Sequence, residues 1–153
     1  MATSARILVI NGPNLNRLGQ RDPAHYGTVT LAQVEDRLRE RAAALGLDLD
    51  CFQSNHEGAL IDCLQERSPG AAGVIINPGA LTSYGLSLRD ALTDTRLPVV
   101  EVHLSNVHAR EPWRSRSVIA PIAVAQIAGM GWRSYLYALE FLAARLTDEG
   151  SSA

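Results

Sequence analysis

Four polar stretches follow apolar segments of the sequence and carry side chains that can bind a polar molecule. They read Asn11-Gly-Pro-Asn14, Gln53-Ser-Asn-His56, Asn77-Pro-Gly79 and His103-Leu-Ser-Asn106. Taken alone, each has the composition of an ordinary loop or helix cap. If the apolar segments are parallel strands, however, their carboxyl ends meet at one edge of a sheet, where ligands bind in such folds. The four stretches together therefore predict one polar site.

His103 begins the last of these stretches, and Glu101 lies two residues before it. Both side chains are of the types needed for proton transfer. Two residues apart on a regular strand, their side chains lie on the same face. A carboxylate beside an imidazole fixes its tautomer and favours its protonated form, which suits a general acid. A core histidine whose hydrogen bonds are satisfied fits the same spacing, so the spacing alone leaves both interpretations open.

The segments that position these residues alternate between apolar runs and amphipathic stretches along the whole chain. Strands are predicted at residues 7–10, 47–52, 74–76, 98–104 and 122–128. Thr30 and Gln33 have capping-box spacing, and a helical apolar repeat then runs to Gly46, a helix-ending residue. Further helices are predicted around residues 60–64, 88–92 and 135–146.

This alternation is typical of repeated β-α units. It predicts an α/β fold: a flavodoxin-like, doubly wound, five-stranded parallel sheet with helices on both faces. With 153 residues, of which 46% are hydrophobic and 20% charged, we expect one domain spanning residues 1–153.

The composition excludes several classes of protein. All 14 basic residues are arginine, so chemistry that needs a lysine amine, such as a Schiff-base lyase, a pyridoxal-phosphate enzyme or a P-loop nucleotidase, has no lysine to use. No strand end carries the glycine-rich pattern of dinucleotide-binding folds. A net charge of −2 gives no general attraction to nucleic acid or an anionic membrane.

Cysteine usage and the amino terminus predict an intracellular protein. Cys51 and Cys63 lack metal-ligand spacing, and we expect two reduced core thiols and no metal site. The apolar run near the amino terminus has four residues, too few for a signal peptide or a membrane span. A cytoplasmic location is therefore expected.

Longer segments resemble the type II dehydroquinases over nearly the whole chain. They are ILVINGPNLNRLGQRDPAHYG, FQSNHEGALID, VIINPGALTSYGLSLRDAL and PVVEVHLSNVHAREPWRSRSVIAP, of which the first and last are the most specific. The resemblance implies a cofactor-free lyase that dehydrates 3-dehydroquinate to 3-dehydroshikimate through an enolate, in the shikimate pathway or in quinate breakdown. No imine forms in that reaction.

The resemblance also implies a role for individual residues. Tyr26 matches the base, and Arg21 the arginine that favours its phenolate, a form scarce at neutral pH for an ordinary phenol. Asn14 matches the residue that holds a water against the enolate oxygen. His103 matches the general acid, with Glu101 beside it. From residue type alone, an exposed tyrosine with two solvated arginines would be the simpler interpretation.

Seven further positions match substrate-binding residues of the family: Asn77, Ser83, Asp90, Leu104, Ser105, Arg110 and Arg114. Leu104 and Ser105 match the site of the substrate carboxylate, and Asp90 matches a residue contributed by a neighbouring subunit. The resemblance thus implies a homo-oligomer, typically trimers that assemble into a dodecamer. Arg110 matches a second arginine near Tyr26.

The sequence departs from the family where a histidine usually binds a ring hydroxyl. That position is Ser83, within Thr82-Ser-Tyr-Gly85. A shorter side chain predicts weaker substrate binding with the catalytic pair intact, by roughly tenfold for one lost hydrogen bond. Two alternatives stay open: a noncatalytic or altered-specificity relative that binds a related cyclic hydroxy acid, and a different lyase or hydrolase. The polar loop of residues 17–27 is expected to be a mobile lid.

Overall fold

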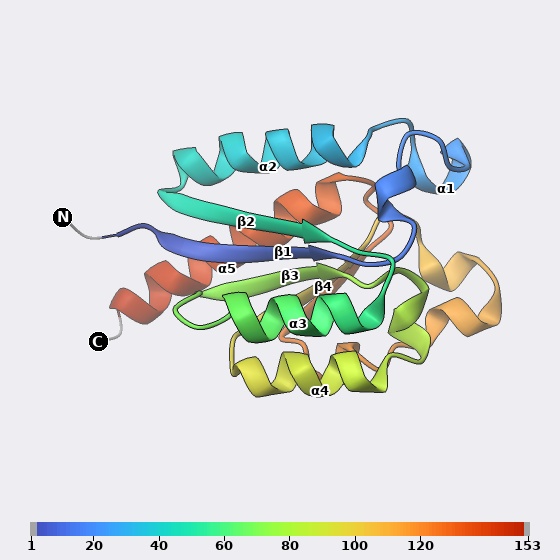
Figure 1. Cartoon of the computed structure of the whole chain (residues 1–153). Helices are drawn as coiled ribbons and strands as arrows, with labels where there is room; N and C mark the ends of the chain where they lie inside the picture. The colour runs from blue at the N-terminus through green and yellow to red at the C-terminus, as the bar shows by residue number, and fades with distance from the viewer. Residues whose placement is uncertain (1–2, 152–153) are drawn as a thin grey trace.

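Five parallel strands form the sheet of the computed structural model, which describes residues 3–151. The strand order is β2-β1-β3-β4-β5, the flavodoxin-like order predicted from the sequence. The strands are β1 (Ala5–Asn11), β2 (Leu47–Gln53), β3 (Gly73–Asn77), β4 (Val99–His103) and β5 (Ala125–Ala128). The strands β1 to β4 point away from the end of the molecule where the chain termini lie (Figure 1), and β5 runs parallel to β4.

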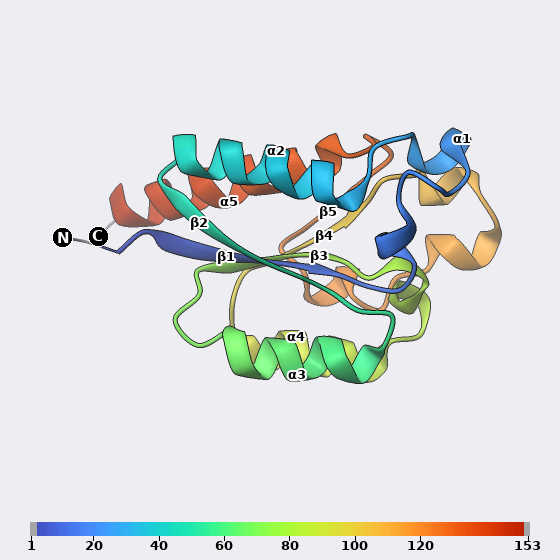
Figure 2. The same cartoon turned by 45° about the horizontal axis from the view of Figure 1, so that its top comes forward.

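Helices cover both faces of this sheet (Figure 2). The helices α2 (Leu31–Ala44) and α5 (Arg133–Ser151) pack on one face, and α3 (Glu57–Arg67) and α4 (Leu86–Thr95) on the other. Because alternate strand residues point to opposite faces, Ile7 and Val9 enter the first core, and Leu8 and Ile10 the second. Burial of both faces explains the continuous apolar runs at residues 7–10 of β1 and 74–76 of β3.

The helix signals around α2 are confirmed in detail. The Thr30 hydroxyl accepts from the Gln33 backbone N–H, and the Gln33 side chain accepts from the Thr30 N–H, which completes the capping box. Gly46 follows the helix with a φ of +73°, a conformation that glycine adopts without steric cost.

The predicted start of the fifth strand was wrong. Residues Ala120–Ile122 form the 3-10 turn η5, and β5 begins only at Ala125. Pro121 lacks the N–H that a strand ladder needs, and the Ser117 hydroxyl accepts from the backbone N–H groups of Ile119 and Ala120. These local hydrogen bonds hold the segment in a turn until it reaches the edge of β4.

The loops at the carboxyl edge of the sheet contain short helices that sequence reasoning missed. They are η1 (Leu15–Arg17), α1 (Pro23–Tyr26), η2 (Gly79–Ser83), η3 (Val107–Ala109) and η4 (Pro112–Ser115). All of them gather at the end of the molecule to which the strands point (Figure 1). Leu15 and Leu18 are buried and anchor the first of these loops in the core.

Candidate active site

Two glycine turns build the floor of the site, where β1 and β3 lie side by side and their connections leave in opposite directions. The Gly12 N–H donates to the Asn77 carbonyl at 2.8 Å, and a Cβ on Gly12 would lie 2.6 Å from the Pro78 carbonyl oxygen. Gly79 has a φ of +59°, and a Cβ there would lie 3.0 Å from the Pro13 carbonyl oxygen. The two turns therefore pack backbone against backbone, which larger residues would prevent.

Above these turns lies a cavity of about 280 Å³. Nine of the twelve site residues predicted from the sequence line it: Asn14, Arg21, Tyr26, Asn77, His103, Leu104, Ser105, Arg110 and Arg114. Three of these are arginines, and no aspartate or glutamate is among the lining residues. A cavity with this lining suits a small anionic molecule that carries several hydroxyl groups.

Tyr26 is held in this wall by α1, a single turn defined by its sequence. Asp22 caps the turn by accepting from the Ala24 N–H at 3.0 Å, and Pro23 occupies its first position. Gly27 ends it with a φ of +68°. The turn therefore stops at Tyr26 and leaves the phenol at the cavity.

Two guanidinium groups meet at the phenol oxygen of Tyr26. Arg21 Nη2 donates to it at 2.9 Å, and Arg110 Nη1 donates to it at 2.8 Å and to the Ser105 hydroxyl at 3.1 Å. The Arg21 guanidinium carbon also lies 3.8 Å from the centroid of the tyrosine ring. Within residues 3–151, Arg21 forms no ion pair with a carboxylate. Its positive charge is therefore directed at the phenol oxygen, with which it forms a charge-assisted hydrogen bond.

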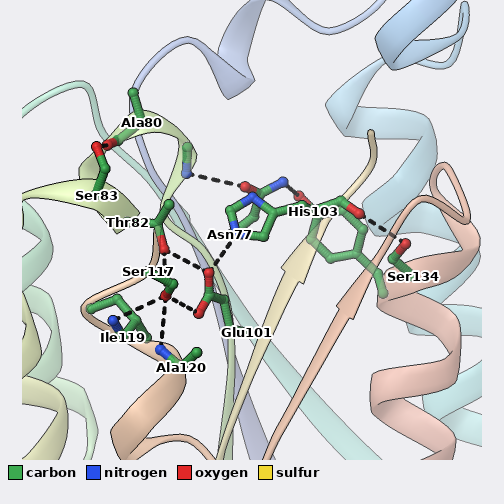
Figure 3. A network of polar contacts seen from close by, with 12 residues as sticks. Asn77, Ala80, Thr82, Ser83, Glu101, His103, Ser117, Ile119, Ala120 and Ser134 are labelled. Atoms are coloured by element: carbon green, nitrogen blue, oxygen red, sulfur yellow. Dashed lines mark hydrogen bonds and ion pairs between the residues drawn. The ribbon is translucent and has the colours of Figure 1, made fainter. Parts of the chain in front are cut away.

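On the other side of the cavity, His103 and Glu101 form the pair expected from their spacing on β4. His103 Nε2 lies 2.5 Å from Glu101 Oε2, and the glutamate is 0% exposed (Figure 3). Thr82 and Ser117 donate to the same carboxylate at 2.6 and 2.7 Å. Burial acts to raise the pKa of Glu101, but the hydrogen bonds and the charge of His103 outweigh it and leave that pKa below its ordinary value of 4.5.

A second tyrosine fixes Asn77 from behind. The Asn77 side-chain N–H donates to the Tyr135 oxygen at 3.0 Å, and the Tyr135 hydroxyl donates to Asn11 Oδ1 at 2.5 Å. Asn77 Oδ1 accepts from the Gly79 N–H at 3.1 Å. Burial raises the pKa of Tyr135 well above its ordinary value of 10.0, an effect that the Asn77 hydrogen bond only partly opposes. This tyrosine therefore stays neutral and acts as a hydrogen-bonding strut.

Ser83 is not among the residues that line this cavity, and its expected contact with substrate stays a prediction. It is the last residue of η2, and its hydroxyl donates to the Ala80 carbonyl at 3.0 Å (Figure 3). This is a local hydrogen bond of the kind that serine side chains often form with nearby backbone groups. Asp90 is exposed on α4 and outside the cavity of its own chain. Its expected role across a subunit boundary stays a prediction.

Sequence reasoning missed the hydroxyls that hold Glu101 and the tyrosine that holds Asn77. Thr82 and Ser117 lie inside the segments that resemble the family, but nothing in their types or spacing marks them as partners of Glu101. Tyr135 was expected only as an apolar residue of the final helix. Its link to Asn11 spans 124 residues, and no local pattern predicts such a contact.

Thiols and acidic clusters add no further site. In residues 3–151 no group of three or more His, Cys, Asp or Glu side chains is arranged to hold a metal ion. Burial raises the pKa of the Cys51 thiol to about 11, so it is neutral at physiological pH. No helix in the described part of the chain is long and apolar enough to cross a membrane.

Comparison with known proteins places this geometry in a family. Residues 5–143 match the family model described as dehydroquinase class II. The chain belongs to the class II dehydroquinase family. It is 63% identical over 137 residues to a 3-dehydroquinate dehydratase of Roseiflexus castenholzii, covering 90% of this chain and 87% of that protein. It is 54% identical over 140 residues to one of Herpetosiphon aurantiacus, covering 92% and 97%.

Solved structures agree with this assignment. A type II dehydroquinase from Butyrivibrio crossotus superimposes with a TM-score of 0.89 at 42% identity, covering 92% of this chain and 99% of that one. The flavodoxin-like fold expected from the sequence is therefore the fold of the family.

Proposed function

We propose that this dehydroquinase converts 3-dehydroquinate to 3-dehydroshikimate with Tyr26 as the base and His103 as the acid. Membership of the class II family supports the overall reaction. The division of roles is supported by the two walls of the cavity: a phenol that accepts from two guanidinium groups, and an imidazole paired with a buried carboxylate. The double donation to the Tyr26 oxygen carries the proposal.

In the first step, the Tyr26 phenolate removes a proton from the carbon next to the substrate ketone. The electron pair of that C–H bond moves toward the carbonyl and produces an enolate. Arg21 and Arg110 make the step possible because each stabilises the phenolate by a charge-assisted hydrogen bond. We propose that Asn14, which lines the cavity, holds a water against the enolate oxygen.

In the second step, the enolate reverts to a ketone and expels the hydroxyl group of the neighbouring carbon. A carbon–carbon double bond forms, the carbon–oxygen bond breaks, and the leaving oxygen takes a proton from His103 to depart as water. Glu101 stabilises the imidazolium before that transfer. The proton on Tyr26 then returns to solvent, and His103 is reprotonated for the next turnover.

We propose that the cavity residues between Tyr26 and His103 bind the substrate. Leu104 and Ser105 follow His103 directly, and we propose that their backbone N–H groups and the serine hydroxyl bind the substrate carboxylate. Asn77 and Arg114 are proposed to bind ring hydroxyls. Arg114 is itself held by Glu111, whose carboxylate accepts from its Nε at 2.9 Å.

Mixing the protein with 3-dehydroquinate and following the ultraviolet absorbance of the conjugated enone acid tests the reaction directly. A rising absorbance is expected, together with full resistance to borohydride in the presence of substrate, because the chain has no lysine to form an imine. A binding protein without catalysis would bind 3-dehydroquinate and leave the absorbance unchanged. That outcome would overturn the proposal.

The assembly and cellular setting are also proposals that rest on the family. We propose a homo-oligomer of trimers that form a dodecamer, in which Asp90 of one subunit reaches the site of its neighbour. A cytoplasmic location and a biosynthetic or quinate-degrading role are proposed on the same ground. Analytical ultracentrifugation tests the assembly: sedimentation as a monomer with full activity would refute a shared site.

A further inference from the structure

We infer that Thr82 and Ser117 are positioning residues that keep Glu101 as a carboxylate and thereby determine which nitrogen of His103 faces the substrate. The inference rests on the proposed function, in which His103 is the acid. The two hydroxyls come from segments 35 residues apart, the 3-10 helix η2 and the turn before η5, and both meet the carboxylate that lies behind His103 (Figure 3).

The direction of the Ser117 proton follows from the partners of its oxygen. Ser117 Oγ accepts from the Ile119 N–H at 3.1 Å and from the Ala120 N–H at 2.8 Å. A hydroxyl has two lone pairs and one proton, so both acceptor positions are filled. The proton must therefore be donated, and the carboxylate oxygen Glu101 Oε1 lies 2.7 Å away.

The same counting settles the Thr82 hydroxyl. Thr82 Oγ1 lies 2.8 Å from Ser117 Oγ and 2.6 Å from Glu101 Oε2. Because the lone pairs of Ser117 are already occupied, Thr82 has no acceptor there. Its proton is donated to Glu101 Oε2, the oxygen that also faces His103.

Each carboxylate oxygen of Glu101 thus accepts a hydrogen bond from a hydroxyl group. If Glu101 were protonated, the proton on either oxygen would point at a hydroxyl that is already donating. The hydroxyls therefore favour the acceptor-only, ionised carboxylate. Two charge-assisted hydrogen bonds offset much of the cost of burying a carboxylate that is 0% exposed.

An ionised Glu101 fixes the tautomer of His103. Since Oε2 has no proton to give, His103 Nε2 must carry one, and it points at the carboxylate. Nδ1 is left for the cavity that His103 lines. The proton that leaves with the substrate hydroxyl therefore comes from Nδ1, and the histidine that remains is the neutral Nε2–H tautomer.

The charged and titratable groups around Glu101 and His103 are few. The hydrogen bonds and ion pairs of Glu101 within residues 3–151 go to His103, Thr82 and Ser117. On the cavity side, the titratable and charged side chains that share the lining with His103 are Tyr26, Arg21, Arg110 and Arg114. Among the described residues, Glu101 is the carboxylate that pairs with the His103 ring.

Ser117→Ala is the cleanest variant because Ser117 does not line the cavity. We expect kcat to fall about tenfold to hundredfold, the size of a lost hydrogen bond to a charged group, with KM within about twofold. Ser117→Thr keeps a hydroxyl and is expected to restore most of the rate. Thr82→Val and Thr82→Ser form a second pair, at a residue that itself lines the cavity.

Thr95→Val is the matched control. The half-buried Thr95 hydroxyl at the end of α4 donates to the Leu92 carbonyl at 2.6 Å and accepts from the Leu97 N–H at 3.2 Å, away from the cavity. Losing it removes one donated and one accepted hydrogen bond but no contact with Glu101, so unchanged kcat and KM are expected.

A double-mutant cycle separates positioning from a merely structural role. If Ser117 acts through Glu101, then Ser117→Ala added to Glu101→Gln changes kcat by less than about twofold. If Ser117 serves only to cap the turn at Ile119 and Ala120, its full loss recurs in the Glu101→Gln background. The second result would overturn the inference.

Nitrogen-15 NMR of labelled histidine gives a readout that does not depend on turnover. In the wild type, neutral His103 should show a protonated Nε2 and an unprotonated Nδ1, and in Thr82→Val/Ser117→Ala a mixture of tautomers. The same single tautomer in both proteins would sink the inference. Absence of activity in the wild type would instead contradict the proposed function. The tautomer measured by NMR would still decide whether the two hydroxyls position His103.

Discussion

The two tyrosines at the carboxyl edge of the sheet have opposite surroundings. Tyr26 is half-buried and its oxygen accepts from two guanidinium groups, whereas Tyr135 is fully buried and its oxygen has two amide partners. Charged donors surround the oxygen of Tyr26, the proposed base, while burial without a neighbouring cation raises the pKa of Tyr135 and keeps it neutral. The same side chain thus suits a base in one place and a strut in the other.

The difference teaches that the partners of a phenol, and not its nearness to the substrate site, decide what it can do. Tyr135 does not line the cavity, but its oxygen accepts a hydrogen bond from the side chain of Asn77, which does. Replacing either tyrosine by phenylalanine removes only the oxygen. Activity and stability should respond in opposite ways to the two changes.

The largest effect is expected for Tyr26→Phe. Loss of a general base costs typically 10²- to 10⁴-fold in rate, so kcat should fall by about that factor. The melting temperature should hardly change, since the lost hydrogen bonds are at the cavity surface. Steady-state assays with 3-dehydroquinate and a thermal melt check both points. A variant with more than half of the wild-type kcat would remove Tyr26 from the mechanism.

Arg21→Gln should have the next largest effect. It removes the charged donor at 2.9 Å from the Tyr26 oxygen while Arg110 remains, and kcat should fall roughly tenfold to a hundredfold. Arg17→Gln is the matched control, because Arg17 is exposed on the same loop and does not line the cavity. Equal losses in the two variants would mean that the charge of the loop, and not the contact with the phenol, is what matters.

Tyr135→Phe should affect stability more than rate. It leaves Asn11 Oδ1 and one Asn77 N–H without their partner in a buried place, at a cost of about 1–3 kcal/mol in the free energy of unfolding. Because Asn77 also lines the cavity, KM should rise modestly, with kcat within tenfold. Urea denaturation together with steady-state kinetics measures both. A stable variant that has lost its kcat would reverse the comparison.

A smaller effect is expected from alkaline pH. The folded state holds Tyr135 neutral above pH 10.0, the ordinary pKa of a phenol, while the unfolded chain releases that proton. The stability contribution of this group is therefore complete below pH 10.0 and is lost as pH rises, by about 1.4 kcal/mol per pH unit. Tyr135→Phe should lack that part of the alkaline slope. Identical slopes in urea titrations between pH 9 and 11 would contradict the burial argument.

The fold could be predicted almost entirely from local patterns. Apolar runs gave the five strands, and Thr30, Gln33 and Gly46 gave the ends of α2, because capping and periodicity depend on neighbours in the sequence. The fifth strand was misplaced at its start because Pro121 and the hydrogen bonds of Ser117 stop the pairing. The single-domain organisation stays a prediction.

The site could be predicted less completely, and mostly through the resemblance. The spacing of Glu101 and His103 alone predicted their contact, since residues two apart on a strand share a face. The hydrogen bond from Arg110 to Tyr26 spans 84 residues. The hydrogen bond from Thr82 to Glu101 joins the 3-10 helix η2 to strand β4. The Ser83 hydroxyl donates to the Ala80 carbonyl, a side-chain conformation that the sequence does not reveal, and its expected contact with substrate stays a prediction.

The central claim is that the arginines act by favouring the phenolate of Tyr26. The most direct measurement places a fluorinated tyrosine, whose phenol loses its proton more readily, at position 26 of the Arg21→Gln variant, with the same residue at position 135 as the control. Recovery of kcat at position 26 alone is the predicted result. If kcat stays as low as in the unmodified Arg21→Gln variant, ionisation of this phenol is not what Arg21 provides, and the account is contradicted.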